Sequence, residues 1–162
     1  MLYTVGIIRI YRYIQIYGFS ITSVNLDAIR RSGFRFVMLQ QDVRLKRKKD
    51  FEILFADGQF VNGALMTMKV WKIDPAKYPR REFKVDDLKI GFVVGLKVSK
   101  SAVKRNRARR QMREVVRLLL KEDLLKRGFM VALVAKPVIL GKEYEEIEKD
   151  MLQILKRASL VK

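Results

Sequence analysis

The sequence predicts an α/β fold, an α+β sandwich of about 110–120 residues in which helices cover at least one face of a sheet. Two periodicities predict it. Apolar residues occupy alternating positions along segments 65–73 and 90–99, as in strands, and segment 129–136 is a short apolar run. Along 102–121 and 143–158 they recur every three or four residues, as in helices. Apolar residues make up 49% of the 162, enough for a packed core.

The N-terminal 37 residues differ from the rest and are expected to be an extension outside the domain formed by residues 38–162. Up to about residue 21 they are apolar and aromatic, but Arg9 and Arg12 interrupt them. No uncharged run approaches the roughly 18–20 residues of a membrane span. Charges inside the apolar part also make a poor signal peptide. We interpret the segment as a strand or an extension, with a membrane-associating segment as the weaker alternative and the cytoplasm as the expected location.

The first helix of the domain is expected after the basic run 44–49. Phe51, Leu54 and Phe55 fall at i, i+3 and i+4, on one face of a short helix. Asp50 is its expected N-cap, and Gly58 is expected to end it.

Two strands and a loop follow. Segment 65–73 is expected to be a strand with Met66 and Met68 on one face and Lys69 on the other. Prolines and charges make 74–87 a loop. Segment 90–99 shows the clearest alternation of side chains between two faces. It is expected to be a strand throughout, with Leu96 and Val98 on its apolar face.

The second half contains the most strongly periodic helix. On the helix expected at 102–121, one face carries Ala108, Met112, Val115 and Leu119. A strand at 129–136 ends before Pro137, and a last helix at 143–158 has an apolar stripe. The resulting order is α-β-β-β-α-β-α, in which one of the four strands has no residues assigned to it.

Charge and composition restrict the chemistry. The chain has 35 Lys and Arg against 17 Asp and Glu, a net charge of +18, which favours a polyanionic partner. Nucleic acid is the favoured partner, and an anionic membrane surface or an acidic protein is the weaker alternative. The sequence has no Cys and no His, so thiolate, zinc-thiolate and imidazole chemistry is excluded. A nuclease acting alone would need carboxylates and Mg²⁺; Asp86 and Asp87 are the nearest candidates, but they fall in a loop.

The polar face of helix 102–121 is densely basic. Like charges at i, i+4, such as Arg105, Arg109 and Arg113, weaken an isolated helix. A polyanion bound along this face relieves the repulsion, and the guanidinium fork suits phosphate oxygens. Binding in a DNA major groove is a weaker alternative, because helix-turn-helix proteins are mostly all-helical whereas this helix lies among strands.

Several of these segments resemble one family. Segment 91–100, closely followed by 102–114 with its Arg105-Asn106-Arg107 triplet, resembles the signature of the bacterial ribonuclease P protein. Segment 48–55 with Gly58, segment 129–137 and the residues from Tyr144 onward are similar to the family's first helix, last strand and C-terminal helix. The resemblance spans about residues 38–160.

The resemblance implies the fold and the function. It implies a mixed four-stranded sheet in which the basic helix joins two parallel strands by a left-handed crossover, although the general rule is right-handed. It also implies a protein subunit that binds the catalytic ribonuclease P RNA and the 5′ leader of precursor tRNA. The RNA then removes the leader using Mg²⁺ that it mainly holds itself, and the protein has no catalytic residue. A structural or ribosomal RNA-binding protein is the alternative function.

The implied site residues form two sets. The RNA-binding set is Lys97, Ser99, Lys100, Lys104, Arg105, Asn106, Arg107, Arg109, Arg110, Arg113 and Arg117. The leader-cleft set is Lys46, Arg47, Lys48, Phe51, Phe55, Met66, Met68 and Lys69. Core packing is the alternative for the two Phe and is favoured for the two Met. Residues 46–49 could extend the leader track and would otherwise be a solvated helix start.

Two features depart from the family pattern. The connection from Ser99-Lys100 to Ala102-Val103 is shorter by about three residues than in family members, so the turn before the basic helix must differ. Residues 38–51 resemble a whole family N-terminus, initiator Met38 included. We therefore hypothesise that translation starts at Met38 and that residues 1–37 come from an over-extended gene prediction; an intact mass near 19.0 kDa for the natively expressed protein would contradict this.

Overall fold

The computed structural model describes residues 41–162, and the expectations for residues 1–37 and Met38 lie outside this part. The described chain follows the predicted order α-β-β-β-α-β-α. Its elements are η1 (Gln41–Val43), α3 (Lys48–Asp57), β1 (Gln59–Asn62), β2 (Met66–Lys72), β3 (Leu88–Val93), α4 (Ala102–Lys121), β4 (Phe129–Ala135), η2 (Pro137–Ile139) and α5 (Tyr144–Arg157).

The four strands form one mixed sheet in the order β1-β2-β4-β3. β2 pairs antiparallel with both β1 and β4, while β3 and β4 are parallel neighbours. The chain passes from β3 to β4 through α4. The predicted mixed four-stranded sheet is therefore confirmed, and the hand of the β3-α4-β4 crossover stays a prediction.

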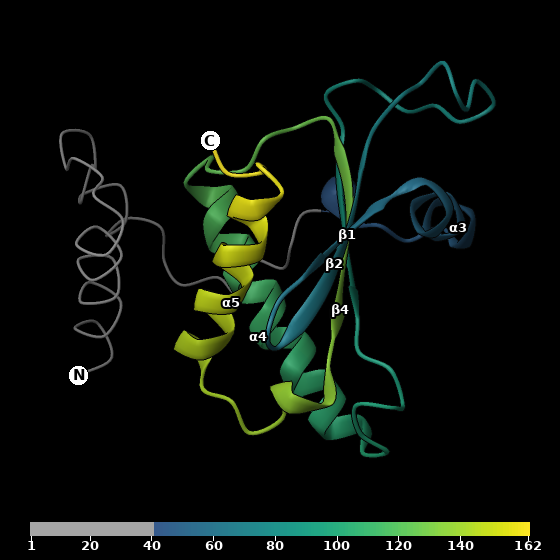
Figure 1. The fold of residues 1–162 in the computed structure, drawn as a ribbon. Helices are drawn as coiled ribbons and strands as arrows, with labels where there is room; N and C mark the ends of the chain where they lie inside the picture. Colours follow the sequence, from purple (N-terminus) through teal and green to yellow (C-terminus); the bar gives the residue numbers. More distant parts are fainter. Residues whose placement is uncertain (1–40) are drawn as a thin grey trace, which may run out of the picture. The chain divides into compact units, whose positions relative to one another are not determined.

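Helices cover both faces of this sheet. Figure 1 views the sheet nearly edge-on, with α3 on one side and α4 and α5 on the other. Residues paired directly across two strands share a face. Trp71 pairs with Met130 on the α3 side, and Met68 pairs with Leu133 on the side of α4 and α5. Successive side chains of β2 therefore point to opposite faces of the sheet and belong to two different cores.

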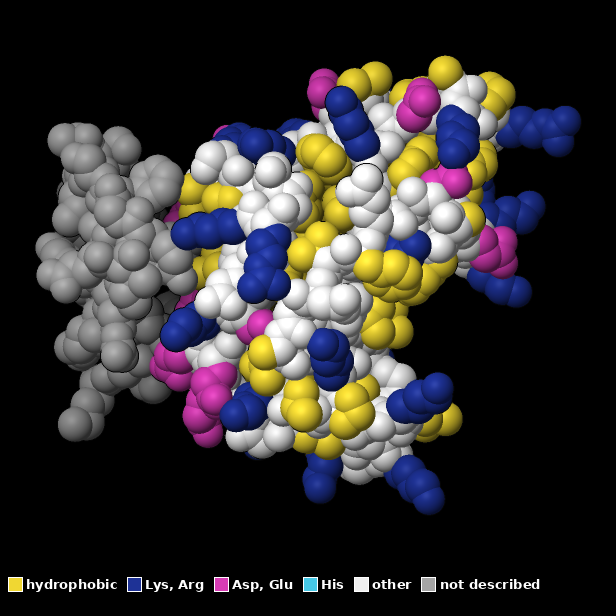
Figure 2. Space-filling model, in the orientation of Figure 1, with side chains coloured by type: hydrophobic (Ala, Val, Ile, Leu, Met, Phe, Trp, Pro, Cys, Tyr) yellow, Lys and Arg dark blue, Asp and Glu magenta, His cyan; other side chains and the backbone are white. Residues whose placement is uncertain are grey.

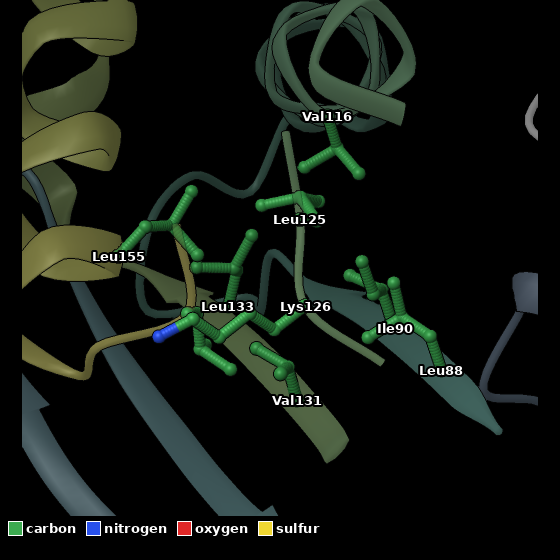
Figure 3. A pocket seen from close by; sticks show the side chains of 9 residues that line it. Leu88, Ile90, Val116, Leu125, Lys126, Val131, Leu133 and Leu155 are labelled. Carbon is green, nitrogen blue, oxygen red and sulfur yellow. The ribbon is translucent and has the colours of Figure 1, made fainter. Parts of the chain in front are cut away.

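The core on the α4 and α5 side is mostly apolar. Figure 3 shows side chains of β3, β4, α4 and α5 pointing toward one another around a small cavity. Its lining residues are Leu88, Ile90, Val116, Leu125, Lys126, Val131, Leu133, Leu155 and Leu160. The end of the chain closes it, because Leu125 and Val161 form a β-bridge. An enclosed apolar space of this kind is a packing feature of the core.

The core on the α3 side is aromatic, and the loop between β2 and β3 completes it. Trp71 meets Tyr78 and Phe83 of that loop edge-on, with ring centroids 5.7 and 6.0 Å apart. The Tyr78 hydroxyl donates a hydrogen bond to Asp57 of α3 at 2.6 Å. The predicted loop 74–87 therefore lies against the first helix.

Three local expectations need correction or refinement. Asp50 is not the N-cap of α3, because the helix begins at Lys48 and Arg47 occupies the cap position. Gly58 does end the helix, as predicted, and its N–H donates to Leu54 O at 2.9 Å. The strand expected at 90–99 stops at Val93, and Leu96, which should have faced inward, is 71% exposed.

Candidate nucleic-acid interface

The turn before α4 is held together by the first arginine of the basic triplet. Ser101 is the N-cap, and its hydroxyl accepts a hydrogen bond from Lys104 N at 3.5 Å. Arg105 Nη1 donates to the carbonyl oxygens of both Ser99 and Lys100, each at 2.8 Å. The short connection is therefore closed by a side chain of the helix that follows it. Arg105 positions this turn, whatever else it binds.

Asn106, the middle residue of the triplet, orients a second arginine. Its Oδ1 accepts a hydrogen bond from Arg109 Nη1 at 2.8 Å. Arg109 Nη2 also lies 3.4 Å from the carbonyl oxygen of Val94, at the end of β3. Arg109 is half-buried, and both of its terminal nitrogens, Nη1 and Nη2, are hydrogen-bonded. Its guanidinium is therefore held in one orientation.

Four guanidinium groups gather near the middle of α4. Partial desolvation, together with repulsion from Arg109, Arg44 and Arg110, lowers the pKa of Arg113 from its ordinary value. Arg44 belongs to this group because its backbone forms a parallel bridge with Ile90. Its Nε is buried and has no hydrogen-bond partner among the described residues. We call Arg44, Arg109, Arg110 and Arg113 the arginine cluster.

Sequence reasoning did not select Arg44 as a site residue. It belongs to the basic run 44–49, which was read as the approach to the first helix. The alternation of basic and apolar residues at Arg44, Leu45 and Lys46 was the local sequence signal of an extended segment. Its pairing with a strand 46 positions later is a long-range contact that no local pattern shows.

Arg117 differs from the other arginines of α4. It forms a two-pronged ion pair with Glu114, with distances of 2.9 and 2.7 Å. The hydrogen bond to this carboxylate raises the pKa of Arg117. Its charge is thus already compensated within the helix, and it is the least suited of the predicted RNA-binding residues to bind a phosphate.

The remaining predicted RNA-binding residues surround the start of α4. Ser99 is half-buried, and the others are exposed: Lys97, Lys100, Lys104 and Arg107. Together with the arginine cluster they carry positive charge from the turn into the middle of the helix. Figure 2 shows Lys and Arg spread over much of this view of the described part, with Asp and Glu concentrated at the start of α5.

The predicted leader-cleft residues divide between surface and core. Lys46, Arg47 and Lys48 are exposed just before and at the start of α3. Phe51 is half-buried against Gly91, where a methyl group would lie 2.8 Å from Phe51 Cζ. Phe55, one helical turn later, is 43% exposed.

Three of the predicted cleft residues are corrected. Met66 and Met68 have no exposed surface and belong to the core on the α4 and α5 side, so they do not line a surface cleft. Lys69 is on the α3 side but is only 4% exposed. Its Nζ donates to Phe55 O at 2.8 Å and to Gly58 O at 2.7 Å, so it stabilises the end of α3 and contributes little surface to a cleft.

Part of the sheet on the α3 side is left partly open. Thr67, Val93 and Val134 are half-buried neighbours on this face. Phe55 and Phe60 lie on the same side, and Phe60 of β1 is 63% exposed. We call these five residues the open sheet face. Figure 2 shows hydrophobic side chains in a hollow of the outline below α3.

Phe60 was missed because no residues had been assigned to the first strand. The four-residue segment 59–62 is too short for its alternation to stand out. The available sequence signal was an aromatic residue, Phe60, two positions after Gly58, the residue expected to end the helix.

The two loop carboxylates do not form a metal site with a third one. Asp86 is exposed, and Asp87 accepts a hydrogen bond from Lys84 N at 3.3 Å and pairs with Lys89. Across residues 41–162, no group of three or more Asp, Glu, His or Cys could hold a metal ion. Within the same residues, no helix is long and apolar enough to cross a membrane.

Known proteins are similar to this chain in sequence. The family model described as Ribonuclease P matches residues 39–159. A ribonuclease P protein component of Pseudanabaena sp. is 34% identical over 124 residues, covering 76% of this chain and 97% of the relative. One from Synechococcus sp. is 36% identical and covers 76% and 87%.

Solved structures share the fold. The RNase P protein of Staphylococcus aureus superposes with a TM-score of 0.61 at 18% identity, covering 74% of this chain and 98% of that one. The RNase P protein of Thermotoga maritima gives 0.57 at 21% identity, covering 70% and 96%. With the family model matching most of the chain, including the whole of α4 and its basic triplet, the chain belongs to the ribonuclease P protein family.

Proposed function

We propose that this chain is the protein subunit of a ribonuclease P ribonucleoprotein, which removes the 5′ leader of precursor tRNA in the cytoplasm. The catalytic RNA cleaves the phosphodiester with Mg²⁺ held mainly by that RNA. The protein binds the RNA through α4 and the leader on the open sheet face, and it is not itself catalytic. A DNA or membrane partner is not part of this proposal.

The arginine cluster is the observation that carries the proposal. Its four side chains come from α4 and from the segment before α3, and desolvation together with their mutual repulsion lowers the pKa of Arg113. Such repulsion destabilises the free protein, and phosphate groups between the guanidiniums relieve it. The Arg109 guanidinium is already fixed by Asn106, and the backbone of Arg44 is fixed by its bridge to Ile90. This pre-organisation lowers the cost of binding a structured RNA.

The open sheet face supports the proposal that the protein binds the single-stranded leader. Proteins bind single strands by combining basic tracks with aromatic or apolar platforms. Phe55 and Phe60 are exposed aromatics on this side, and Lys46, Arg47 and Lys48 lie at the start of the helix that borders it. The arrangement suits an unpaired leader better than a duplex, because an exposed platform can only stack on bases that are unstacked.

The experiment is multiple-turnover cleavage of a precursor tRNA by a bacterial ribonuclease P RNA at low Mg²⁺, with and without the full chain. We expect strong stimulation by the protein. Arg113→Ala should lower kcat/KM at a limiting protein concentration by about tenfold, equivalent to about 1.4 kcal/mol of lost binding. Arg127→Ala, a control in the exposed turn after α4, should leave it unchanged.

The alternative function, a structural RNA-binding protein, gives a different result. It would bind structured RNA tightly through α4 but would not stimulate cleavage even with the ribonuclease P RNA from the same organism. Tight binding without stimulation would therefore replace the proposed function by this alternative.

A further inference from the structure

Phe60 and Lys69 form a stacked pair next to the end of α3. Lys69 Nζ lies 4.2 Å from the centroid of the Phe60 ring. The same Nζ donates to Phe55 O and Gly58 O at 2.8 and 2.7 Å. An ammonium group has three donors, so two are taken by carbonyl oxygens and the ring receives the charge on one face.

This arrangement holds the ring while leaving it exposed. Lys69 is 4% exposed and cannot move without breaking two hydrogen bonds, whereas Phe60 remains 63% exposed. The backbone of Phe60 is fixed as well, because it pairs with Lys69 in the β1-β2 ladder. One face of the ring is supported by a buried cation, and the ring is otherwise open to solvent. A single exposed Phe would normally be free to change rotamer.

The neighbours of Phe60 indicate what binds there. Phe55 lies on the same side and is 43% exposed. Asn62 lies two residues further along β1, and its Oδ1 accepts a hydrogen bond from the hydroxyl of Thr67 in β2 at 3.2 Å, so amide and hydroxyl groups lie nearby. Aromatic rings beside neutral hydrogen-bonding groups match a nucleobase, which has a flat face and polar edges. Because the charge of Lys69 is enclosed, this place differs from the phosphate-binding arginines of α4.

We propose that the solvent-facing side of Phe60 stacks on one base of the 5′ leader and that Lys69 is a positioning residue that fixes the ring. The inference rests on the proposed function and adds a base-level contact to it.

The test uses the full chain and single-stranded leader RNAs in which 2-aminopurine replaces one base at a time. Stacking quenches 2-aminopurine fluorescence, so wild-type protein should quench it at one leader position. Phe60→Leu should remove the quenching there and weaken leader binding at least fivefold. Phe60→Tyr, which keeps an aromatic ring, should restore both. Val138→Ala, another exposed apolar residue but outside the open sheet face, is the matched control.

Lys69→Met tests the support of the ring. It removes the charge but keeps an unbranched side chain, so quenching should decrease while the far-ultraviolet circular dichroism stays that of the wild type. If this variant does not fold, an abasic nucleotide decides instead. Removing the base at the quenched position should weaken wild-type binding at least fivefold and leave the binding of Phe60→Leu unchanged.

Several outcomes would overturn the proposal. Equal quenching by wild type and Phe60→Leu would show that Phe60 does not stack on a base. The same conclusion would follow if both proteins lost the same affinity when the leader carried the abasic nucleotide. Loss of a dimer on Phe60→Leu, with leader binding unchanged, would show that the ring serves self-association through the edge strand β1. These readouts do not depend on cleavage, so a failure of the proposed function appears separately as absence of stimulation.

Discussion

The carboxylate of Asp150 in α5 accepts a hydrogen bond from the backbone N–H of Leu65, 2.9 Å away and 85 positions earlier in the chain. The same carboxylate accepts from Ala64 N at 2.7 Å and Met66 N at 3.2 Å. Asp150 is buried, and these contacts fix the β1-β2 hairpin to the last helix. The hairpin carries Phe60, so this buried side chain on one face of the sheet determines the position of an exposed ring on the other.

Replacing Asp150 should therefore destabilise the protein. Asp150→Ala leaves three backbone N–H groups without their acceptor, and each buried unsatisfied donor costs about 1–3 kcal/mol. We expect the free energy of unfolding to fall by at least about 2 kcal/mol, measured as a lower urea midpoint with an unchanged m-value. Gln153→Ala, an exposed position of α5, should change it by less than about 0.5 kcal/mol. Equal effects of the two variants would contradict the role of Asp150.

Gly91 is required by the ring of Phe51. A Cβ at Gly91 would lie 2.8 Å from Phe51 Cζ and 3.2 Å from Leu45 Cδ2, too close for either to remain in place. Gly91→Ala should cost about 1–3 kcal/mol of stability by overpacking. Gly95→Ala, four residues on, has no atom within 4 Å of the new methyl and should be nearly neutral.

A double-mutant cycle identifies the cause. In a Phe51→Leu background the ring is absent, so Gly91→Ala should cost at least about 0.5 kcal/mol less than in the wild type. An unchanged cost would assign the strain to Leu45 or to the backbone of β3.

The helices and the order of the elements along the chain could be predicted because they depend on local periodicity. α4 begins and ends at Ala102 and Lys121, as expected, since Ser101 caps it and its apolar face is continuous. Strand 90–99 was too long because apolar alternation continues past Val93, where the chain turns. There, Arg105 holds the carbonyls of Ser99 and Lys100, a contact made by a helix that follows the turn.

The candidate site was predicted less completely, for two physical reasons. The burial of Lys69 depends on carbonyl oxygens at the end of α3, and a lysine in a strand is otherwise expected to be exposed. Arg44 reaches the arginine cluster only through sheet pairing with Ile90. Both require the tertiary arrangement, whereas the basic face of α4 is visible from helical spacing alone.

The contact between the β2-β3 loop and α3 should depend on acidic pH. The hydrogen bond from the Tyr78 hydroxyl, with the contact to Lys77, lowers the pKa of Asp57 from its ordinary value of 3.8. A folded-state pKa below the unfolded one stabilises the fold fully above about pH 4, and this contribution is lost as the pH falls through the folded-state pKa. Asp57→Asn should therefore lower the urea midpoint at pH 7 and have a smaller effect at pH 3.

Asp86→Asn is the control for this pH dependence. Asp86 is exposed in the same loop, so its replacement reports the effect of removing a loop carboxylate by itself. If Asp57→Asn and Asp86→Asn gave the same midpoints at both pH values, the contact between Asp57 and Tyr78 would contribute nothing to folding.

The salt dependence of RNA binding should report the number of cations that meet phosphates. If about six do, the slope of log K against log of the salt concentration is about −4, since each phosphate contact contributes about 0.7 in single-strand-type binding. Arg109→Ala and Arg113→Ala should each make the slope shallower by about 0.7, whereas Arg117→Ala should change it less because Glu114 already pairs with Arg117. Fluorescence anisotropy of a labelled RNA from low to moderate salt measures this. A wild-type slope shallower than about −1.5 would mean that no more than about two cations meet phosphates, and the arginine cluster would then not be the RNA-binding surface.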